Sequence, residues 1–156
     1  MPICEKLKKY LDDNKIRYVV VAHSRAYTAQ EIAASVHIKG KNLVKCVMID
    51  GDQKYYMVTI SANHKINMEK LKQVLQVKHV KLAQEHDFKE LFEDCEVGAM
   101  PPFGNLYNIP VLVDQTLYTD GDIAFNGGNH STVVKMSFQD FDQLVNPQKV
   151  AIADSF

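Results

Sequence analysis

The sequence contains few cysteines, and their arrangement limits the kind of protein that it encodes. The 156 residues include three, Cys4, Cys46 and Cys95, and none of them belongs to a Cys-x-x-Cys motif. An odd number of widely spaced cysteines fits a reducing compartment better than a disulfide scaffold. We therefore expect a protein of a reducing compartment.

Long apolar stretches are also absent. No run approaches the ~20 residues that an α-helix needs to span a bilayer. The first residues, 1–6, enter an amphipathic pattern directly and lack the apolar block of a signal peptide. These absences predict a soluble cytoplasmic domain that has no membrane partner.

An excess of charge of one sign is missing as well. Eighteen basic and 19 acidic residues give a formal net charge of -1. Proteins that coat nucleic acid present a large basic face, so the balance predicts no DNA partner. A small enzyme that touches one end of an RNA remains compatible with it.

The motifs of several large enzyme classes are missing. The six histidines show no ligand spacing such as His-x-x-x-His, which predicts no metal site, and nothing in the sequence calls for a cofactor. The sequence also lacks the Gly-x-x-x-x-Gly-Lys-Ser/Thr and Gly-x-Ser-x-Gly motifs. P-loop and α/β-hydrolase chemistry therefore have no support.

Hydrophobic periodicity predicts a mixture of helices and strands in a single domain, residues 1–156. Helical stripes occupy residues 3–11, 29–36, 68–75, 88–92 and 138–144, and strand-like runs occupy 17–22, 42–50, 54–60, 79–82, 111–113, 123–125 and 132–136. Hairpin-like connections imply a mixed or antiparallel sheet with helices outside, which is an α+β fold. The tail after about 147 has no strong signal and is expected to fray.

Three short signals define element boundaries. Thr28 and Glu31 have the spacing of a capping box, and Ser137 with Asp140 is expected to cap the last helix. The short turn around Gly51 predicts that the strands before and after it form a hairpin.

Lys45 is the most informative single residue. It is the only charged member of the apolar run 43–49, where alternation places it on one face with Leu43, Val47 and Ile49. An ammonium group among such neighbours is costly unless something anionic or polar meets it. Two interpretations remain open: Lys45 extends its charge to water or pairs with a structural carboxylate such as Asp114, or it has a function.

The segment 98–104 is the second candidate. Gly98 and Gly104 bracket Pro101 and Pro102, which predicts a stiff loop. Its remaining N–H groups, at residues such as Ala99 and Met100, would suit an oxyanion or a phosphate. The alternative is a rigid connection between a helix and a strand.

The segment 126–130 is the third candidate. Gly127 and Gly128 allow close approach of the backbone, and His130 can donate or accept a proton near neutral pH. The alternative is a glycine-rich turn with a solvent-facing histidine. Cys46 follows Lys45 and is expected to be a small buried hydrophobe on the opposite face of the strand.

The order of these segments resembles the YbaK/prolyl-tRNA synthetase-associated editing domain family, roughly from Tyr27 to Leu144. The segments that carry the resemblance are Lys45, Ile60-Ser61-Ala62, Leu91 to Glu96, Gly98 to Gly104, Ile109 to Asp114, and Phe125 to His130. The loop together with its following Pro-Val-x-x-Asp strand is quite specific, whereas the lysine alone is not.

The resemblance implies a central mixed, largely antiparallel sheet flanked by helices. It also implies a trans-acting, free-standing deacylase that hydrolyses mischarged aminoacyl-tRNA carrying alanine, serine or cysteine, with tRNA(Pro) as the expected carrier and prolyl-tRNA synthetase as a candidate partner. The family's functional lysine falls on Lys45, and its substrate loop falls on Gly98 and Pro102. The late histidine of some members matches His130.

The resemblance leads to a mechanistic hypothesis in which the enzyme positions and polarises the acceptor-end ester. Lys45 is expected to be catalytic. Substrate binding is expected from the two glycine segments, at Gly98, Ala99, Met100, Pro101, Pro102, Gly127, Gly128 and His130. Two alternatives remain open: a non-catalytic module that binds aminoacyl-tRNA or a synthetase, and cyclisation of a cysteinyl substrate by its own thiol.

Overall fold

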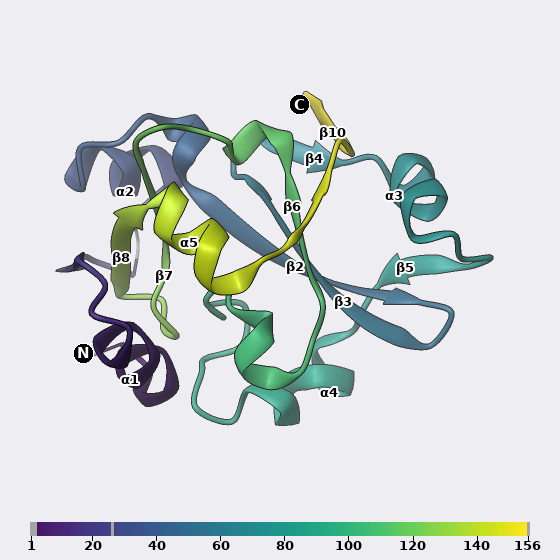
Figure 1. The fold of residues 1–156 in the computed structure, drawn as a ribbon, viewed down its shortest axis with the longest axis horizontal. Coiled ribbons are helices and arrows are strands. Elements are labelled where there is room, and N and C mark those ends of the chain that lie inside the picture. The colour runs from purple at the N-terminus through teal and green to yellow at the C-terminus, as the bar shows by residue number, and fades with distance from the viewer. Residues whose placement is uncertain (1–2, 26, 156) are drawn as a thin grey trace.

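Two β-sheets around a shared core form the centre of the protein (Figure 1). The computed structural model describes residues 3–25 and 27–155. The larger sheet has the strand order β5 (Val80–Leu82), β2 (Val44–Gly51), β3 (Lys54–Ser61), β6 (Val111–Asp114) and β9 (Gln148–Val150). The second has the order β1 (Tyr18–Ala22), β8 (Thr132–Ser137) and β7 (Asp122–Asn126). A short ribbon pairs β10 (Ala153–Ser155) with β4 (His64–Ile66).

Helices surround these sheets. The α-helices are α1 (Glu5–Asp13), α2 (Ala29–Ser35), α3 (Met68–Leu75), α4 (Glu85–Phe88) and α5 (Phe138–Val145). One-turn 3₁₀ helices cover Gly40–Asn42, Lys89–Phe92, Gly104–Tyr107 and Gln115–Leu117. The fold is therefore α+β, as predicted.

The pairing pattern makes the larger sheet mixed. β2 pairs antiparallel with β3 and β5, whereas β6 pairs parallel with β3 and β9. The other two groups of strands are antiparallel throughout. The predicted mixed, largely antiparallel arrangement is confirmed, and so is the hairpin at Gly51.

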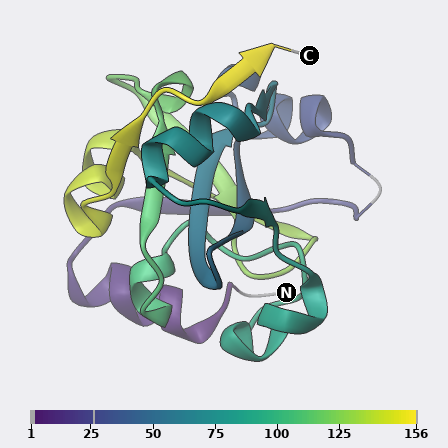
Figure 2. The same cartoon turned by 90° about the vertical axis from the view of Figure 1, so that its right-hand side faces the viewer.

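Three hydrophobic clusters fill the spaces between the layers. The largest lies on one face of the central sheet, where α1 and α5 contribute Leu7 and Phe141. On the opposite face, Leu71 of α3 packs against Val58, and α3 lies in front of the β2–β3 hairpin in Figure 2. A smaller cluster joins Val36, at the end of α2, to both sheets.

The predicted helix caps are confirmed. The Glu31 amide donates to the Thr28 hydroxyl at 3.1 Å, and the Thr28 amide donates to the Glu31 carboxylate at 3.0 Å, so both bonds of a capping box are made. The Ser137 hydroxyl accepts from the Asp140 amide at 3.1 Å and begins α5. Local side-chain chemistry therefore fixes where two helices begin.

The prediction that the chain frays after about 147 is wrong. β9 pairs with β6, and β10 pairs with β4. The buried Asp114 carboxylate also stabilises this tail, because one of its oxygens accepts a hydrogen bond from the Ile152 amide at 2.7 Å. Its other oxygen accepts from the Thr116 amide at 2.8 Å. Asp114 therefore has a structural role that stabilises the C-terminal segment.

The fourth predicted helix is only partly regular. Residues 85–88 form α4, and a 3₁₀ turn follows over Lys89–Phe92. Within the described part of the chain, no helix combines the length and the apolar character that crossing a membrane requires.

Candidate active site

Lys45 is the second residue of β2 in the larger sheet and lies opposite Ile60 of β3. Val44 and Met48, on the other face of β2, pack in the largest cluster. Leu43, on the same face as Lys45, packs in the smaller cluster that contains Val36. Lys45 is partly buried, and this burial lowers the pKa of its ammonium group. The predicted alternation along the strand is confirmed, and Lys45 is a partly desolvated amine.

A single bridge between the two sheets places Lys45 relative to the last glycine turn. Leu43 forms a parallel bridge with Ala124 of β7. Two positions further along each strand lie Lys45 and Asn126, which point to the same faces of their strands as Leu43 and Ala124. Asn126 ends β7, and the Gly127–His130 turn follows it directly. The strand that carries Lys45 thus runs beside the strand that leads into this turn.

The Gly98 loop and the Gly127–His130 turn are joined to each other by hydrogen bonds. The Gly128 amide donates to the Ala99 carbonyl at 3.1 Å, and the Glu96 amide donates to the Gly128 carbonyl at 2.7 Å. The His130 ring nitrogen Nε2 lies 2.8 Å from the Val97 carbonyl oxygen. Because a carbonyl only accepts, Nε2 carries the proton, and in a neutral ring Nδ1 is then an acceptor.

Gly98 adopts a backbone conformation that favours glycine. Its φ is +84°, in the left-handed region. A Cβ at this position would lie 3.5 Å from His130 Cε1 and 3.7 Å from Nε2. The absence of a side chain at Gly98 therefore leaves room beside the imidazole of His130.

An ion pair fastens this junction to the segment that precedes α2. The Arg25 guanidinium donates two hydrogen bonds to the Glu96 carboxylate, at 2.9 and 2.7 Å. The same carboxylate accepts from the His130 amide at 3.3 Å. Bonding from Arg25, together with the His130 amide, lowers the pKa of Glu96 from 4.5 to about 2. Three segments distant in the sequence therefore meet at Glu96.

Replacing Glu96 by glutamine is expected to remove part of the acid sensitivity of folding. Because the folded-state pKa is depressed, ionised Glu96 stabilises the fold fully above 4.5, and this contribution is lost as the pH falls through about 2. The stability advantage of the wild type over Glu96→Gln should therefore be constant above about pH 5 and shrink towards pH 2. Urea unfolding midpoints across this range measure the difference.

Glu93→Gln provides the matched control, since Glu93 is an exposed carboxylate in the same loop. Its profile should follow that of the wild type. A Glu96→Gln profile parallel to the wild type at every pH would contradict the assigned role of the Arg25–Glu96 pair.

One backbone amide of the Gly98 loop, that of Ala99, is not available to bind a ligand as predicted. The Ala99 amide donates to the Glu96 carbonyl at 3.1 Å, so it is occupied within the loop. The amides of Gly98 and Met100 make no hydrogen bond to the residues that the structure describes. They replace Ala99 as the candidate donors to a bound group.

The remaining loop residues lie in the protein interior. The side chains of Ala99 and Met100 are buried, and so are Pro101 and Pro102. Met100 and its neighbour Phe103 belong to the largest cluster. These residues therefore hold the shape of the loop from inside.

Gly127 and Gly128 permit close packing of the N-terminal segment. A Cβ on Gly127 would lie 2.6 Å from Ile3 Cγ2, and one on Gly128 would lie 2.8 Å from Cys4 Cβ. Gly128 also has a φ of +104°. The absence of a side chain at both glycines therefore allows residues 3–4 to pack closely against the turn.

Cys46 is partly buried and packs against the largest cluster. Its burial raises the pKa of the thiol, which disfavours the nucleophilic thiolate. Cys46 lies on the face opposite Lys45 as predicted, but it is partly rather than fully buried.

Three residues at this junction were not predicted from the sequence. Arg25 and Glu96 form its ion pair. His23 donates its amide to the Ser131 carbonyl at 2.8 Å, and its ring stacks on Tyr27 with centroids 5.7 Å apart. The buried Nε2 of His23 has no hydrogen-bond partner among the described residues. No local motif marks these positions, because each acts on a segment far along the chain.

Comparison with known proteins identifies the family. The sequence model of the aminoacyl-tRNA editing domain matches residues 23–144. A proline–tRNA ligase of Bacillus cereus strain AH187 is 30% identical over 88 residues, which is 56% of this chain and 15% of the ligase. The ligase of strain G9842 is 27% identical over 106 residues, 68% of this chain and 19% of the ligase. The chain thus matches only a small part of the ligases' length.

Solved structures share the fold. A candidate trans-editing enzyme for prolyl tRNA synthetase superposes with a TM-score of 0.84 at 19% identity and covers 99% of both chains. A candidate signal transduction protein from Marinobacter aquaeolei VT8 gives a TM-score of 0.75 at 18% identity over 98% of this chain and 31% of that protein. With the family match covering most of its length, the chain belongs to the aminoacyl-tRNA editing domain family.

Proposed function

We propose that the protein is an aminoacyl-tRNA deacylase that hydrolyses the ester of a mischarged tRNA carrying alanine, serine or cysteine. The observation that carries the proposal is the junction of the Gly98 loop and the His130 turn, beside the strand that presents Lys45. The relation to proline–tRNA ligases supports tRNA(Pro) as the carrier and a prolyl-tRNA synthetase as the protein that delivers it.

The proposed reaction transfers the aminoacyl group to water. Water adds to the ester carbonyl, the bond from that carbon to the ribose oxygen breaks, and the ribose oxygen takes up a proton. A neighbouring ribose hydroxyl assists in activating the water. The protein's share is to hold the ester and to stabilise the negative charge that develops on the carbonyl oxygen.

Lys45 supplies positive charge for this purpose. A partly desolvated ammonium interacts more strongly with a developing anion than one in bulk water. It would hold the ester carbonyl or the neighbouring phosphate. The amides of Gly98 and Met100 would orient the aminoacyl group and donate to the oxyanion, and one such donor contributes on the order of 3 kcal/mol to catalysis.

Selection of small amino acids would follow from the stiffness of the loop. Pro101 and Pro102 fix its backbone from within the core, so the loop resists displacement by a larger side chain. Pockets reject groups that are too large more readily than groups that are too small. Correctly charged Pro-tRNA(Pro) would therefore be spared.

A panel of charged tRNAs tests the proposal. Ala-, Ser- and Cys-tRNA(Pro) are incubated with the purified chain, with Pro-tRNA(Pro) as the protected substrate, and ester loss is followed on acid gels. We expect loss of at least one small-residue ester well above its spontaneous rate. Binding of these tRNAs without faster ester loss would instead favour a non-catalytic recognition module.

A further inference from the structure

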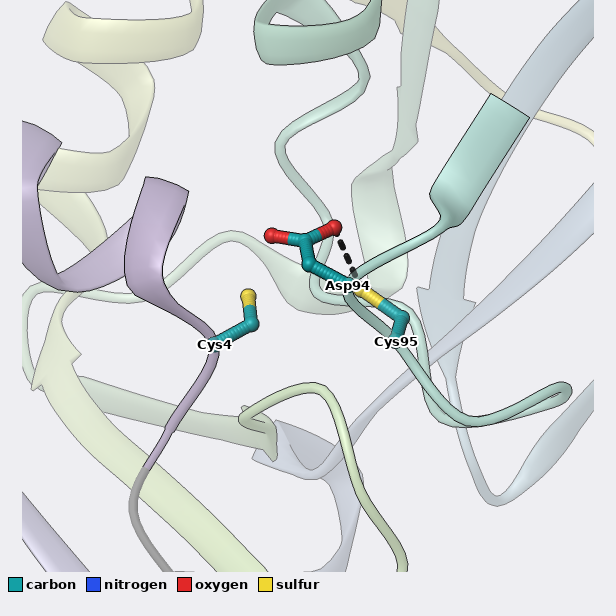
Figure 3. A group of neighbouring side chains, drawn as sticks. All are labelled: Cys4, Asp94 and Cys95. Atoms are coloured by element: carbon teal, nitrogen blue, oxygen red, sulfur yellow. Dashed lines mark hydrogen bonds between the residues drawn. The ribbon is translucent and has the colours of Figure 1, made fainter. Parts of the chain in front are cut away.

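Two thiols and a carboxylate meet outside the candidate active site. Cys4, just before α1, faces Asp94 and Cys95, which follow the 3₁₀ turn ending at Phe92 (Figure 3). Their potential ligand atoms, two sulfurs and one carboxylate oxygen, all lie within 4.8 Å of one another. The Cys95 thiol also lies 3.6 Å from Asp94 Oδ1.

We propose that Cys4, Asp94 and Cys95 bind a thiophilic divalent cation of the Zn²⁺ class. Thiolate sulfur favours borderline and soft cations over Mg²⁺ or Ca²⁺, and a carboxylate is an accepted third ligand of zinc. Three protein ligands leave one tetrahedral position for water or another small ligand. Contraction of the three groups to about 2.0–2.3 Å from a shared cation requires only small side-chain movements.

Tyr107 supports the carboxylate from behind. Its hydroxyl donates to Asp94 Oδ1 at 2.8 Å and lies 3.5 Å from the Cys95 sulfur. Such outer hydrogen bonds orient a ligating group and are a regular part of metal sites. The second Asp94 oxygen makes no hydrogen bond to the residues that the structure describes.

The cluster opens to solvent through an acidic cavity. All three proposed ligands line a cavity of about 360 Å³. Its lining also includes Glu5, Glu93 and Glu96, whereas Lys6, the nearby cation, lies 4.7 Å over the ring of Tyr107. Glu96 is already paired with Arg25. The excess of carboxylates at the entrance favours cation entry.

A cation here would fasten the N-terminal segment to the active-site loops. The Cys4 amide donates to the Gly127 carbonyl at 2.8 Å, and the residue after Cys95 donates to the Gly128 carbonyl. Cys4 and Cys95 therefore flank the base of the turn that carries His130. The cation would act as a structural link, and its binding is independent of the proposed deacylation.

Cobalt binding to the full-length, reduced and chelator-treated chain tests the site. Titration of Co²⁺ under anaerobic conditions is expected to give thiolate-to-cobalt charge-transfer absorption that saturates at one equivalent and is displaced by Zn²⁺. Thiol counting before titration verifies that all three cysteines are reduced. Zn²⁺ is also expected to raise the melting temperature of the wild type.

Matched variants separate this site from adventitious binding. Cys4→Ser, Cys95→Ser and Asp94→Asn should each weaken binding more than about a hundredfold, and Tyr107→Phe about tenfold, since outer partners alone change affinity 10- to 100-fold. Cys46→Ser and Glu90→Gln should bind as the wild type does, since neither residue lines the cavity. Asp94 is exposed, so Asp94→Asn keeps the test valid if a cysteine variant unfolds.

Two results would overturn the proposal. One is the absence of a charge-transfer band in the reduced wild type. The other is equal loss of binding in Cys46→Ser and Cys4→Ser.

Discussion

Lys45→Ala is expected to reduce the rate of deacylation of a small-residue ester at least about a hundredfold, the usual effect of removing one preorganised group that stabilises a developing oxyanion. The substitution removes the partly buried ammonium from the second position of β2. Single-turnover measurements with the most reactive mischarged tRNA give the rate directly. The fold should survive, because alanine keeps the backbone pairing of β2 with β3.

Lys54→Ala is the control for this prediction. Lys54 begins β3 at the far end of the same hairpin and is exposed. It should keep the wild-type rate, which separates loss of the Lys45 group from a general change in charge. Near-normal turnover by folded Lys45→Ala would refute the catalytic assignment of Lys45.

Gly98→Val is the second variant for which we expect a large effect. A β-branched residue at a φ of +84° carries about 1–3 kcal/mol of backbone strain. Its Cβ would make an ordinary contact with His130 Cε1 at 3.5 Å, and the γ-methyl groups would add further bulk beside the imidazole. Displacement of the reacting groups by about 1 Å can cost a hundredfold in rate, so we expect a loss of that order.

Gly121→Val is the control glycine substitution. A Cβ on Gly121 would lie 3.6 Å from the Thr119 hydroxyl oxygen, an ordinary contact in an exposed loop. Rates should be measured with alanyl, seryl and cysteinyl esters for both variants. Unchanged rates of Gly98→Val on all three would dismiss the proposed role of the loop.

Elements with strong local signals were predictable from the sequence. The Thr28 capping box, the hairpin around Gly51 and the burial of Phe138 and Phe141 in α5 depend on residues within a few positions of each other. Side-chain periodicity and capping encode such features directly. The fold class followed from them.

Three of the short strands, β4, β9 and β10, were not predicted, whereas β5 was. β4, β9 and β10 are three residues long, too short for alternation to stand out. Each exists because a partner strand presents a matching edge. The buried Asp114 carboxylate also accepts a hydrogen bond from the Ile152 amide in the tail, and no sequence pattern predicts this bond.

Some residues of the candidate site were proposed from the sequence, but their connections were not. Lys45, Gly98 and His130 were identified singly, whereas the bonds that join Glu96 to Arg25 and to the His130 amide depend on the tertiary fold. The Ala99 amide was assigned to ligand binding because its turn bond to the Glu96 carbonyl could not be foreseen.

The proposed cation site shows the same limit. We predicted none because the sequence has no short ligand spacing. Cys4 and Cys95 meet only after the N-terminal segment packs on the Gly127–Gly128 turn. Spacing rules detect sites built within one segment, and this cluster is built from two.

The position of β9 at the edge of the larger sheet has a consequence for synthesis on the ribosome. β6 is paired on one side by β3, which precedes it, and on the other by β9, near the end of the chain. The Asp114 carboxylate likewise cannot accept its hydrogen bond from the Ile152 amide until residue 152 has been synthesised. The nascent domain therefore cannot close its sheet until these late residues emerge from the exit tunnel. The β2–β3 hairpin can form as soon as it emerges, whereas the larger sheet is completed by one of the last segments of the domain to appear.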